Sequence, residues 1–117
     1  MKYYYNGKLV RTSDHEYTHA VIDMSTGKCK GCRASEEKAM AIKAEEIGKY
    51  EARITGCLKQ IKALEEGKTF WYCKYGRDTF KTPIRMSKAE LEQMMADIQK
   101  DIDRIGQDWQ IVKLEAK

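Results

Sequence analysis

The stretch SEEKAMAIKAEEIGKYEARITGCLKQIKAL, residues 35–64, decides the fold because it predicts one long helix. Ser35 suits the N-cap, and Glu36 and Glu37 follow in the first turn, where the helix dipole favours acidic side chains. Apolar residues recur at heptad spacing in the series Met40, Ile47, Ile54, Ile61 and in the series Tyr50, Cys57, Leu64. This pattern predicts an apolar seam along most of the helix.

The length of this helix predicts self-association. At a rise of about 1.5 Å per residue it is roughly 45 Å long, whereas the core of a compact domain of this size is roughly 28 Å across. We therefore expect a homo-oligomer, either a dimer or a larger assembly such as a hexamer, whose copies meet along the helix.

A second pattern on the same helix is a ridge of small residues, formed by Ala44, Gly48, Ala52 and Gly56. A glycine inside a helix costs about 1 kcal/mol relative to alanine, so a compensating interaction is expected. Two interpretations remain open: close approach by another helix, or a floor beneath a bound ligand.

The whole chain predicts a single α+β domain: a small antiparallel sheet with one long and one shorter helix, in a helix-mediated oligomer. Asn6-Gly7 indicates a hairpin turn, and Ser87 with Glu90 forms the S-x-x-E pattern of a capping box. The expected parts are an N-terminal sheet (1–34), the long helix (35–66), an aromatic and basic segment (67–86), the second helix (87–106) and a C-terminal strand (107–117). We expect Gly106 to end the second helix.

The charge balance is mildly basic, with 22 Lys and Arg against 18 Asp and Glu, which gives a net charge of +4. This suits an anionic partner, but no run of five or more basic residues marks a nucleic-acid tail, so we expect no nucleic-acid polymer as a partner. Neither a transmembrane run nor a signal peptide is recognisable, so we expect a cytoplasmic protein without membrane contact.

Cysteine and histidine are the residues that could carry other chemistry. Cys29 and Cys32 form a CxxC motif, which is compatible with ordinary thiols, a metal site or redox chemistry. No second CxxC or HxxxH follows at zinc-finger spacing, so we expect no metal and no cofactor. His15 and His19 could act in acid–base catalysis only with a nucleophile and an orienting group, and no such motif is present. We therefore do not expect an enzyme.

Residues 67–86 give the strongest functional signal, because aromatic and basic residues alternate there. Aromatic rings stack on purines, and Arg and Lys bind phosphate. The candidate ligand-binding residues are Phe80, Arg77, Arg85, Lys81, Arg53 and Arg11. The alternative is that Phe70, Trp71 and Tyr72 are core or interface anchors with solvated basic neighbours.

The opening YYYNGKLVRTS (residues 3–13), followed by EYTHAV (residues 16–21), resembles the N-terminal sheet of the first family of phage Thoeris anti-defence proteins. The resemblance implies a sheet with two helices, assembly through the helices, and a sponge activity. Such sponges sequester glyco-cyclic ADP-ribose, the signal of the Thoeris immune system, without degrading it. Some members are also associated with cyclic nucleotide signals of CBASS systems, including cyclic trinucleotides.

The resemblance and the aromatic and basic segment agree with each other. Adenine would stack on an aromatic ring, and the pyrophosphate would meet arginines, so we expect a phage anti-defence sponge that acts in the bacterial host cytoplasm during infection. The alternative is a small phage inhibitor that binds a host defence protein directly, in the manner of an anti-CRISPR protein.

Overall fold

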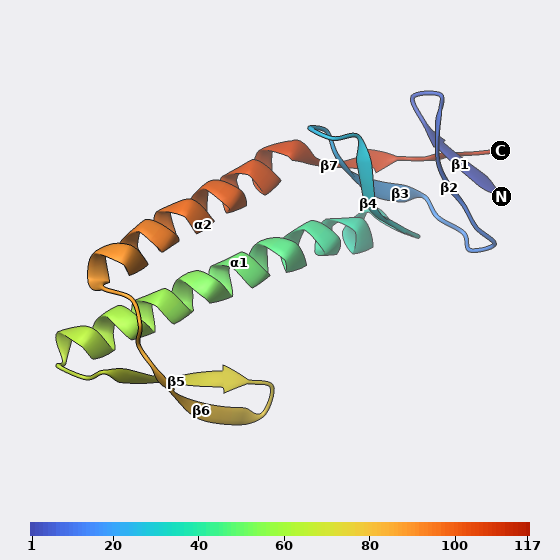
Figure 1. Ribbon diagram of the computed structural model, residues 1–117. Coiled ribbons are helices and arrows are strands. Elements are labelled where there is room, and N and C mark those ends of the chain that lie inside the picture. The colour runs from blue at the N-terminus through green and yellow to red at the C-terminus, as the bar shows by residue number, and fades with distance from the viewer. The chain divides into compact units, whose positions relative to one another are not determined.

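The computed structural model describes residues 1–117 and divides into two compact units. Unit 1 consists of Met1–Gly48 and Asp103–Lys117, and unit 2 consists of Lys49–Ile102. Both helices contribute to both units, so the boundary falls within helices and not in a linker. The predicted α+β class, with small antiparallel sheets, one long helix and one shorter helix, is confirmed (Figure 1).

Unit 1 contains two three-stranded antiparallel sheets, each of which takes one strand from the C-terminal segment. The first has the order β2-β1-β8, with strands Lys8–Thr12, Lys2–Tyr5 and Glu115–Ala116. The second has the order β4-β3-β7, with strands Lys28–Arg33, His19–Asp23 and Trp109–Lys113. The expectation of a single sheet within residues 1–34 is therefore wrong in this respect, because the C-terminal strands complete two separate sheets.

The first hairpin follows its sequence signal. Asn6 and Gly7 connect β1 to β2 with positive φ angles of 49° and 78°, as the type I′ turn requires. Asp23 ends β3 and accepts hydrogen bonds from the Ser25 amide (3.0 Å) and the Ser25 hydroxyl (2.6 Å). These bonds lower the pKa of Asp23 and fix the turn toward β4.

Tyr3 is the polar anchor of the unit 1 core. Its side chain is 1% exposed and packs with Ala20, Cys32 and Val112. Its hydroxyl accepts a hydrogen bond from the Tyr17 amide at 3.1 Å and donates one to the carbonyl of His15. The ring therefore fills the core while the hydroxyl fixes the loop between β2 and β3.

The long helix α1 spans Glu36–Glu65, within one residue of the predicted segment. The Ser35 hydroxyl accepts a hydrogen bond from the Lys38 amide at 3.2 Å, which confirms the N-cap. At the other end, the amides of Gly67 and Lys68 donate to the carbonyls of Leu64 and Ala63, with Gly67 at φ 76°. This is a Schellman motif, and it turns the chain directly into β5.

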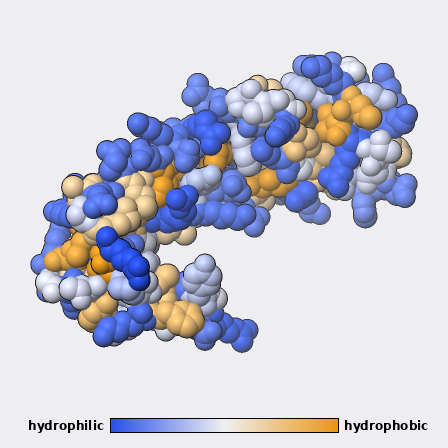
Figure 2. Space-filling view, in the orientation of Figure 1, coloured by the Kyte–Doolittle hydropathy of each residue, from blue (hydrophilic) through white to orange (hydrophobic).

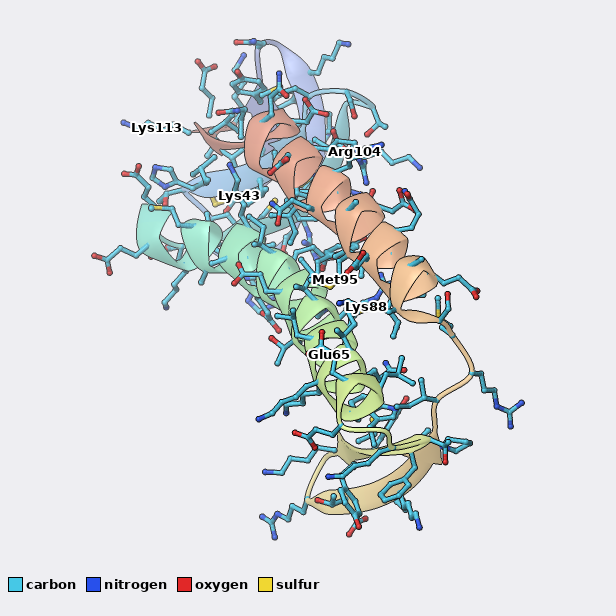
Figure 3. All side chains as sticks on the ribbon, turned by 90° about the vertical axis from the view of Figure 1, so that its left-hand side faces the viewer. Lys43, Glu65, Lys88, Met95, Arg104 and Lys113 are labelled. Atoms are coloured by element: carbon cyan, nitrogen blue, oxygen red, sulfur yellow. The ribbon has the colours of Figure 1, made fainter.

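The shorter helix α2 spans Lys88–Asp108. Ser87 and Glu90 make the reciprocal hydrogen bonds of the predicted capping box, at 3.1 and 3.4 Å. Gly106 does not end this helix as expected: it has no positive φ, and the helix continues until β7 begins at Trp109. Figure 3 shows Lys88 beside Glu65 of α1; their 3.1 Å ion pair raises the pKa of Lys88.

The core of unit 2 lies between α1 and α2. Cys57 and Ile61 of α1 are buried against Leu91 and Ile98 of α2. Further residues of the predicted heptad seam pack at the margin of this cluster, namely Tyr50, Ile54 and Leu64. Within unit 2 the seam is therefore covered by α2 of the same chain.

The ridge of small residues has different surroundings at its two glycines. A Cβ atom added at Gly56 would lie 3.5 Å from the Trp71 ring of β5, whereas one added at Gly48 would meet no atom within 4 Å. In this chain the neighbour of Gly56 is thus an aromatic ring and not a second helix. Neither helix has a stretch long and apolar enough to cross a bilayer.

Tyr3→Phe tests the anchoring role of the Tyr3 hydroxyl. The substitution leaves the ring in place but removes the hydrogen-bond partner of the Tyr17 amide and the His15 carbonyl, two partly buried bonds, so we expect a loss of about 1–2 kcal/mol in the free energy of unfolding. Urea denaturation measures the change. Tyr4→Phe is the matched control: Tyr4 is only partly buried, and we expect a change within about 0.5 kcal/mol. Equal effects of the two substitutions would contradict the role assigned to Tyr3.

Candidate functional site

The candidate site is the hairpin of unit 2, formed by β5 (Phe70–Tyr75) and β6 (Asp78–Pro83). Gly76 and Arg77 make a two-residue turn, with Gly76 at φ 62°, the pattern of a type II′ turn. The amide of Ile84 donates to the carbonyl of Thr69 at 2.9 Å and closes the base of the hairpin. The predicted aromatic and basic segment is thus an ordered two-stranded sheet.

The Trp71 ring connects the hairpin to α1. Trp71 is only partly buried, and the edge of its indole lies over Gly56. A Cβ atom at residue 56 would lie 3.5 Å from this edge, so a side chain larger than that of alanine would compete with the ring for the same space. Figure 1 shows β5 running back alongside the C-terminal part of α1. Since an isolated two-stranded sheet is marginal in water, this contact is a main source of the hairpin's stability.

Strand pairing assigns the hairpin side chains to two faces. Residues directly opposite one another share a face, and Tyr72 pairs with Lys81 while Cys73 pairs with Phe80. The first face therefore carries Phe70, Tyr72 and Lys81, and the second face carries Trp71, Cys73, Tyr75 and Phe80. Phe80 and Lys81, which are adjacent in the sequence, lie on opposite faces.

The first face combines aromatic rings with a close cation. The Phe70 and Tyr72 rings meet edge to face, with centroids 5.7 Å apart at 83°. The ammonium group of Lys81 lies 4.0 Å from the Phe70 centroid, within cation–π range. Tyr72 is 61% exposed, so its ring remains available for stacking.

A shallow cavity of about 510 Å³ continues from the first face onto the end of α1. It is lined by Phe70, Trp71, Tyr72, Lys59, Lys62, Ala63, Glu66 and Lys68. Lys68 forms an ion pair with Glu66 at 3.1 Å, while Lys59 and Lys62 add two further positive charges to the wall. Aromatic rings and lysines thus lie together around one cavity, a combination that suits a phosphorylated ligand with an aromatic base.

The second face and the turn hold two of the predicted residues. Phe80 is 52% exposed, Tyr75 is 77% exposed, and Arg77 lies exposed in the turn between them. Figure 2 shows hydrophobic and hydrophilic side chains next to one another at the free end of the hairpin. Arg85 follows β6 in the connection to α2 and is also exposed.

Arg53 and Arg11 have other surroundings. Arg53 lies over the Tyr50 ring at 5.7 Å and lines a cavity of about 440 Å³ together with the acidic residues Glu90, Asp97 and Asp101 of α2. Arg11 belongs to unit 1, where its guanidinium lies 5.4 Å from the Tyr17 centroid. The structure thus brings Phe80, Arg77 and Lys81 onto one hairpin, leaves Arg85 just beyond it, and gives Arg53 and Arg11 separate environments.

Sequence reasoning did not assign Phe70, Tyr72, Lys59 or Lys62 to the candidate site. An alternative interpretation made Phe70 and Tyr72 core or interface anchors, and a period of two along β5 is the signal that could have placed both on one outward face. The lysines at 59 and 62 are three apart, and helical spacing could have placed them on one side of α1.

The histidines and cysteines, which could carry other chemistry, lie outside the hairpin except for Cys73. His19 is partly buried and its Nδ1 lies 2.7 Å from the Thr18 hydroxyl, while His15 is exposed. All four cysteines are free thiols, and Cys29 and Cys32 lie close together in β4. No group of three or more His, Cys, Asp and Glu side chains is placed to hold a metal ion.

Comparison with known proteins finds no matching family model, no matching curated protein and no matching solved structure.

Trp71→Ala tests whether the hairpin depends on its contact with α1. Removing the ring leaves Gly56 uncovered, and we expect a loss of about 2 kcal/mol, below the cost for a fully buried tryptophan. Urea denaturation measures the stability, and hydrogen exchange of the Ile84 amide reports on the hairpin base. Tyr75→Ala, at a position 77% exposed, should change stability by less than about 0.5 kcal/mol. Unchanged protection of the Ile84 amide in Trp71→Ala would contradict the dependence.

Proposed function

We propose that the protein binds and sequesters a cyclic nucleotide signal of the cyclic ADP-ribose class without cleaving it. The observation that carries the proposal is the hairpin, where Tyr72, Tyr75 and Phe80 are each more than half exposed beside Arg77 and Lys81. Rings left in water next to cations provide both contacts that a nucleotide needs: stacking for the base and charge-assisted hydrogen bonds for the pyrophosphate.

The anti-defence role is proposed from the resemblance of residues 3–21 to the first family of Thoeris anti-defence proteins. It implies glyco-cyclic ADP-ribose as the ligand, cyclic trinucleotides as a second ligand class, and action in the cytoplasm of an infected bacterium. Sequestration requires only affinity, so the proposed role assigns no catalytic residue to the hairpin.

Two surfaces of the hairpin could receive the ligand. The second face and the turn offer Phe80 and Arg77, with Arg85 nearby in the sequence. The first face offers Tyr72 and Lys81 beside the cavity lined by Lys59 and Lys62. Single substitutions on each face separate the two, because Phe80 and Tyr72 point to opposite sides of the sheet.

The ligand test uses calorimetry and thermal shift with glyco-cyclic ADP-ribose. We expect micromolar or tighter binding, and recovery of the unaltered ligand after heat denaturation. Phe80→Ala should cost about 1–3 kcal/mol through lost stacking, and Arg77→Ala about 1.5–3 kcal/mol through a lost charged hydrogen bond. Lys113→Ala, at an exposed position of β7 in unit 1, is the control and should bind normally. Tyr72→Ala reports on the first face in the same assay.

The result that overturns the proposal is the absence of stabilisation at micromolar concentrations of both the cyclic ADP-ribose isomer and a cyclic trinucleotide. Recovery of a cleaved product would instead indicate an enzyme.

The second candidate function, direct inhibition of a host defence protein, is favoured by the two unpaired edges of the hairpin, which could accept a strand from a partner. Capture of one stoichiometric host protein that is lost in Phe80→Ala would support it.

We also propose that the protein is a helix-mediated homo-oligomer. Met40 and Leu58 of α1 are 52% and 51% exposed, and the ridge is open at Gly48. Exposed apolar side chains on a long helix, and a position on it that is open enough for close approach, are each suited to a second helix.

Gly48→Leu tests this assembly. The chain itself offers open space at Gly48, so we expect the variant to keep its helix content, while the added side chain weakens self-association by about 1–3 kcal/mol. Sedimentation equilibrium measures the change. Gly106→Leu is the matched control, since Gly106 also lies in a helix with open space at its Cβ position but is not part of the ridge. A wild-type protein that remains monomeric at high concentration would refute the assembly.

A further inference from the structure

The β4 strand brings two thiols together by means of a bulge. In a regular strand, residues three apart point to opposite faces, so Cys29 and Cys32 would not meet. Here Val21 pairs with Gly31, while the next residue of β3, Ile22, pairs with Cys29, which leaves one extra residue in β4. The bulge restores the two cysteines to one face, and their Sγ atoms lie 3.8 Å apart.

Packing around Gly31 holds this bulge in place. A Cβ atom at Gly31 would lie 2.8 Å from Cδ1 of Ile42 in the first part of α1, so a larger residue would require the Ile42 side chain to move. The guanidinium of Arg33 donates to the carbonyl of Cys32 at 2.7 Å. The thiols are therefore brought together by the fold of unit 1.

The two thiols differ in access. Cys32 is 0% exposed and belongs to the core around Tyr3, and burial together with Cys29 raises its pKa to about 11. Cys29 is exposed and lines a cavity of about 350 Å³ with Leu9 and Met24. A reagent in solution can therefore reach the exposed Cys29 thiol directly, whereas the Cys32 thiol is buried next to it.

We propose that Cys29 and Cys32 are a reactive dithiol that closes to a disulfide by exchange with a small-molecule disulfide such as oxidised glutathione. Cys29 is the attacking thiol and Cys32 is the resolving thiol. The dithiol lies in unit 1 and is independent of the function proposed for the hairpin.

The exchange proceeds in two balanced steps. The Cys29 thiolate attacks one sulfur of the oxidant; a mixed disulfide forms, the oxidant's S–S bond breaks, and one glutathione leaves as a thiolate that takes up a proton. Cys32 then loses its proton and attacks Sγ of Cys29, which forms the protein disulfide and releases the second glutathione. Overall, two protein thiols lose two electrons and two protons, and one small disulfide becomes two thiols.

The short sulfur–sulfur distance makes the second step intramolecular. Deprotonation of buried Cys32 is unfavourable near neutral pH, and the fixed position of its sulfur offsets this through a high effective concentration. Arg11 also interacts with the Cys32 thiol and acts to lower its pKa. The mixed disulfide at Cys29 should therefore be short-lived whenever Cys32 is present.

The test treats the reduced protein, with Cys73→Ser as background, with oxidised glutathione. We expect a mass lower by two hydrogen atoms, a peptide that links Cys29 to Cys32, and no lasting glutathione adduct. Adding Cys32→Ser should instead trap glutathione on Cys29, and adding Cys29→Ser should abolish the reaction. Cys57 stays in place because it is buried in unit 2.

A second measurement needs no substitution in the dithiol. Phenylarsine oxide bridges two thiols within reach of each other, with loss of one water, and we expect one arsenical per reduced chain and protection of Cys29 and Cys32 from alkylation. The proposal is overturned by a stable glutathione adduct on Cys29 while Cys32 is intact, or by failure of the arsenical to protect both thiols. Circular dichroism verifies that the Cys32→Ser variant is folded. If the variant is not folded, protection of both thiols by the arsenical in the unsubstituted dithiol is the result that supports or overturns the proposal.

Discussion

The pairing of β7 with β3 is the interaction on which the organisation of unit 1 depends. β3 is buried over most of its length and lies between β4 and β7, with an unbroken antiparallel register from His19–Lys113 to Asp23–Trp109. Without β7, residues 19–33 would be a two-stranded hairpin, which is marginal in water. The same pairing fixes where α2 ends, because β7 begins directly after Asp108. The cost is the closure of a long loop, since about ninety residues separate the paired strands.

The local elements were largely predictable from the sequence because their signals are local. Ser35 and Ser87 cap helices, Asn6-Gly7 makes a type I′ turn, and Gly67 ends α1, each through hydrogen bonds between residues close in the chain. The partners of the strands were not predictable, because pairing depends on long-range burial that no local pattern encodes. Three features depend on such long-range contacts and were not predicted. They are the two separate sheets, the short strand β8 and the continuation of α2 past Gly106.

The candidate site was predictable in composition but not in geometry. The alternation of rings and cations in residues 67–86 identified the segment that forms the hairpin. The face on which each side chain lies depends on the strand register, and a shift of the register by one residue would move every side chain of a strand to the other face. This is why Phe80 and Lys81, neighbours in the sequence, lie on opposite sides. Arg53, expected at the same site, instead lines a cavity with Glu90 and Asp97 of α2. The direction of a helical side chain follows from packing between helices, which the heptad pattern alone does not resolve.

The bulge in β4 and the hairpin in unit 2 illustrate one physical point about where function can be sought in a small chain. Both depart from a regular, buried arrangement: the bulge interrupts a ladder, and the hairpin leaves three large rings in water. An unbroken β4 would place Cys29 and Cys32 on opposite faces, and the exposed rings of Tyr72, Tyr75 and Phe80 lie outside the core of unit 2. Each is held in place by a specific contact, Ile42 against Gly31 and Trp71 over Gly56. Specific packing thus places two thiols side by side and leaves three rings in water, and these are the features to which we assign the proposed chemical and binding roles.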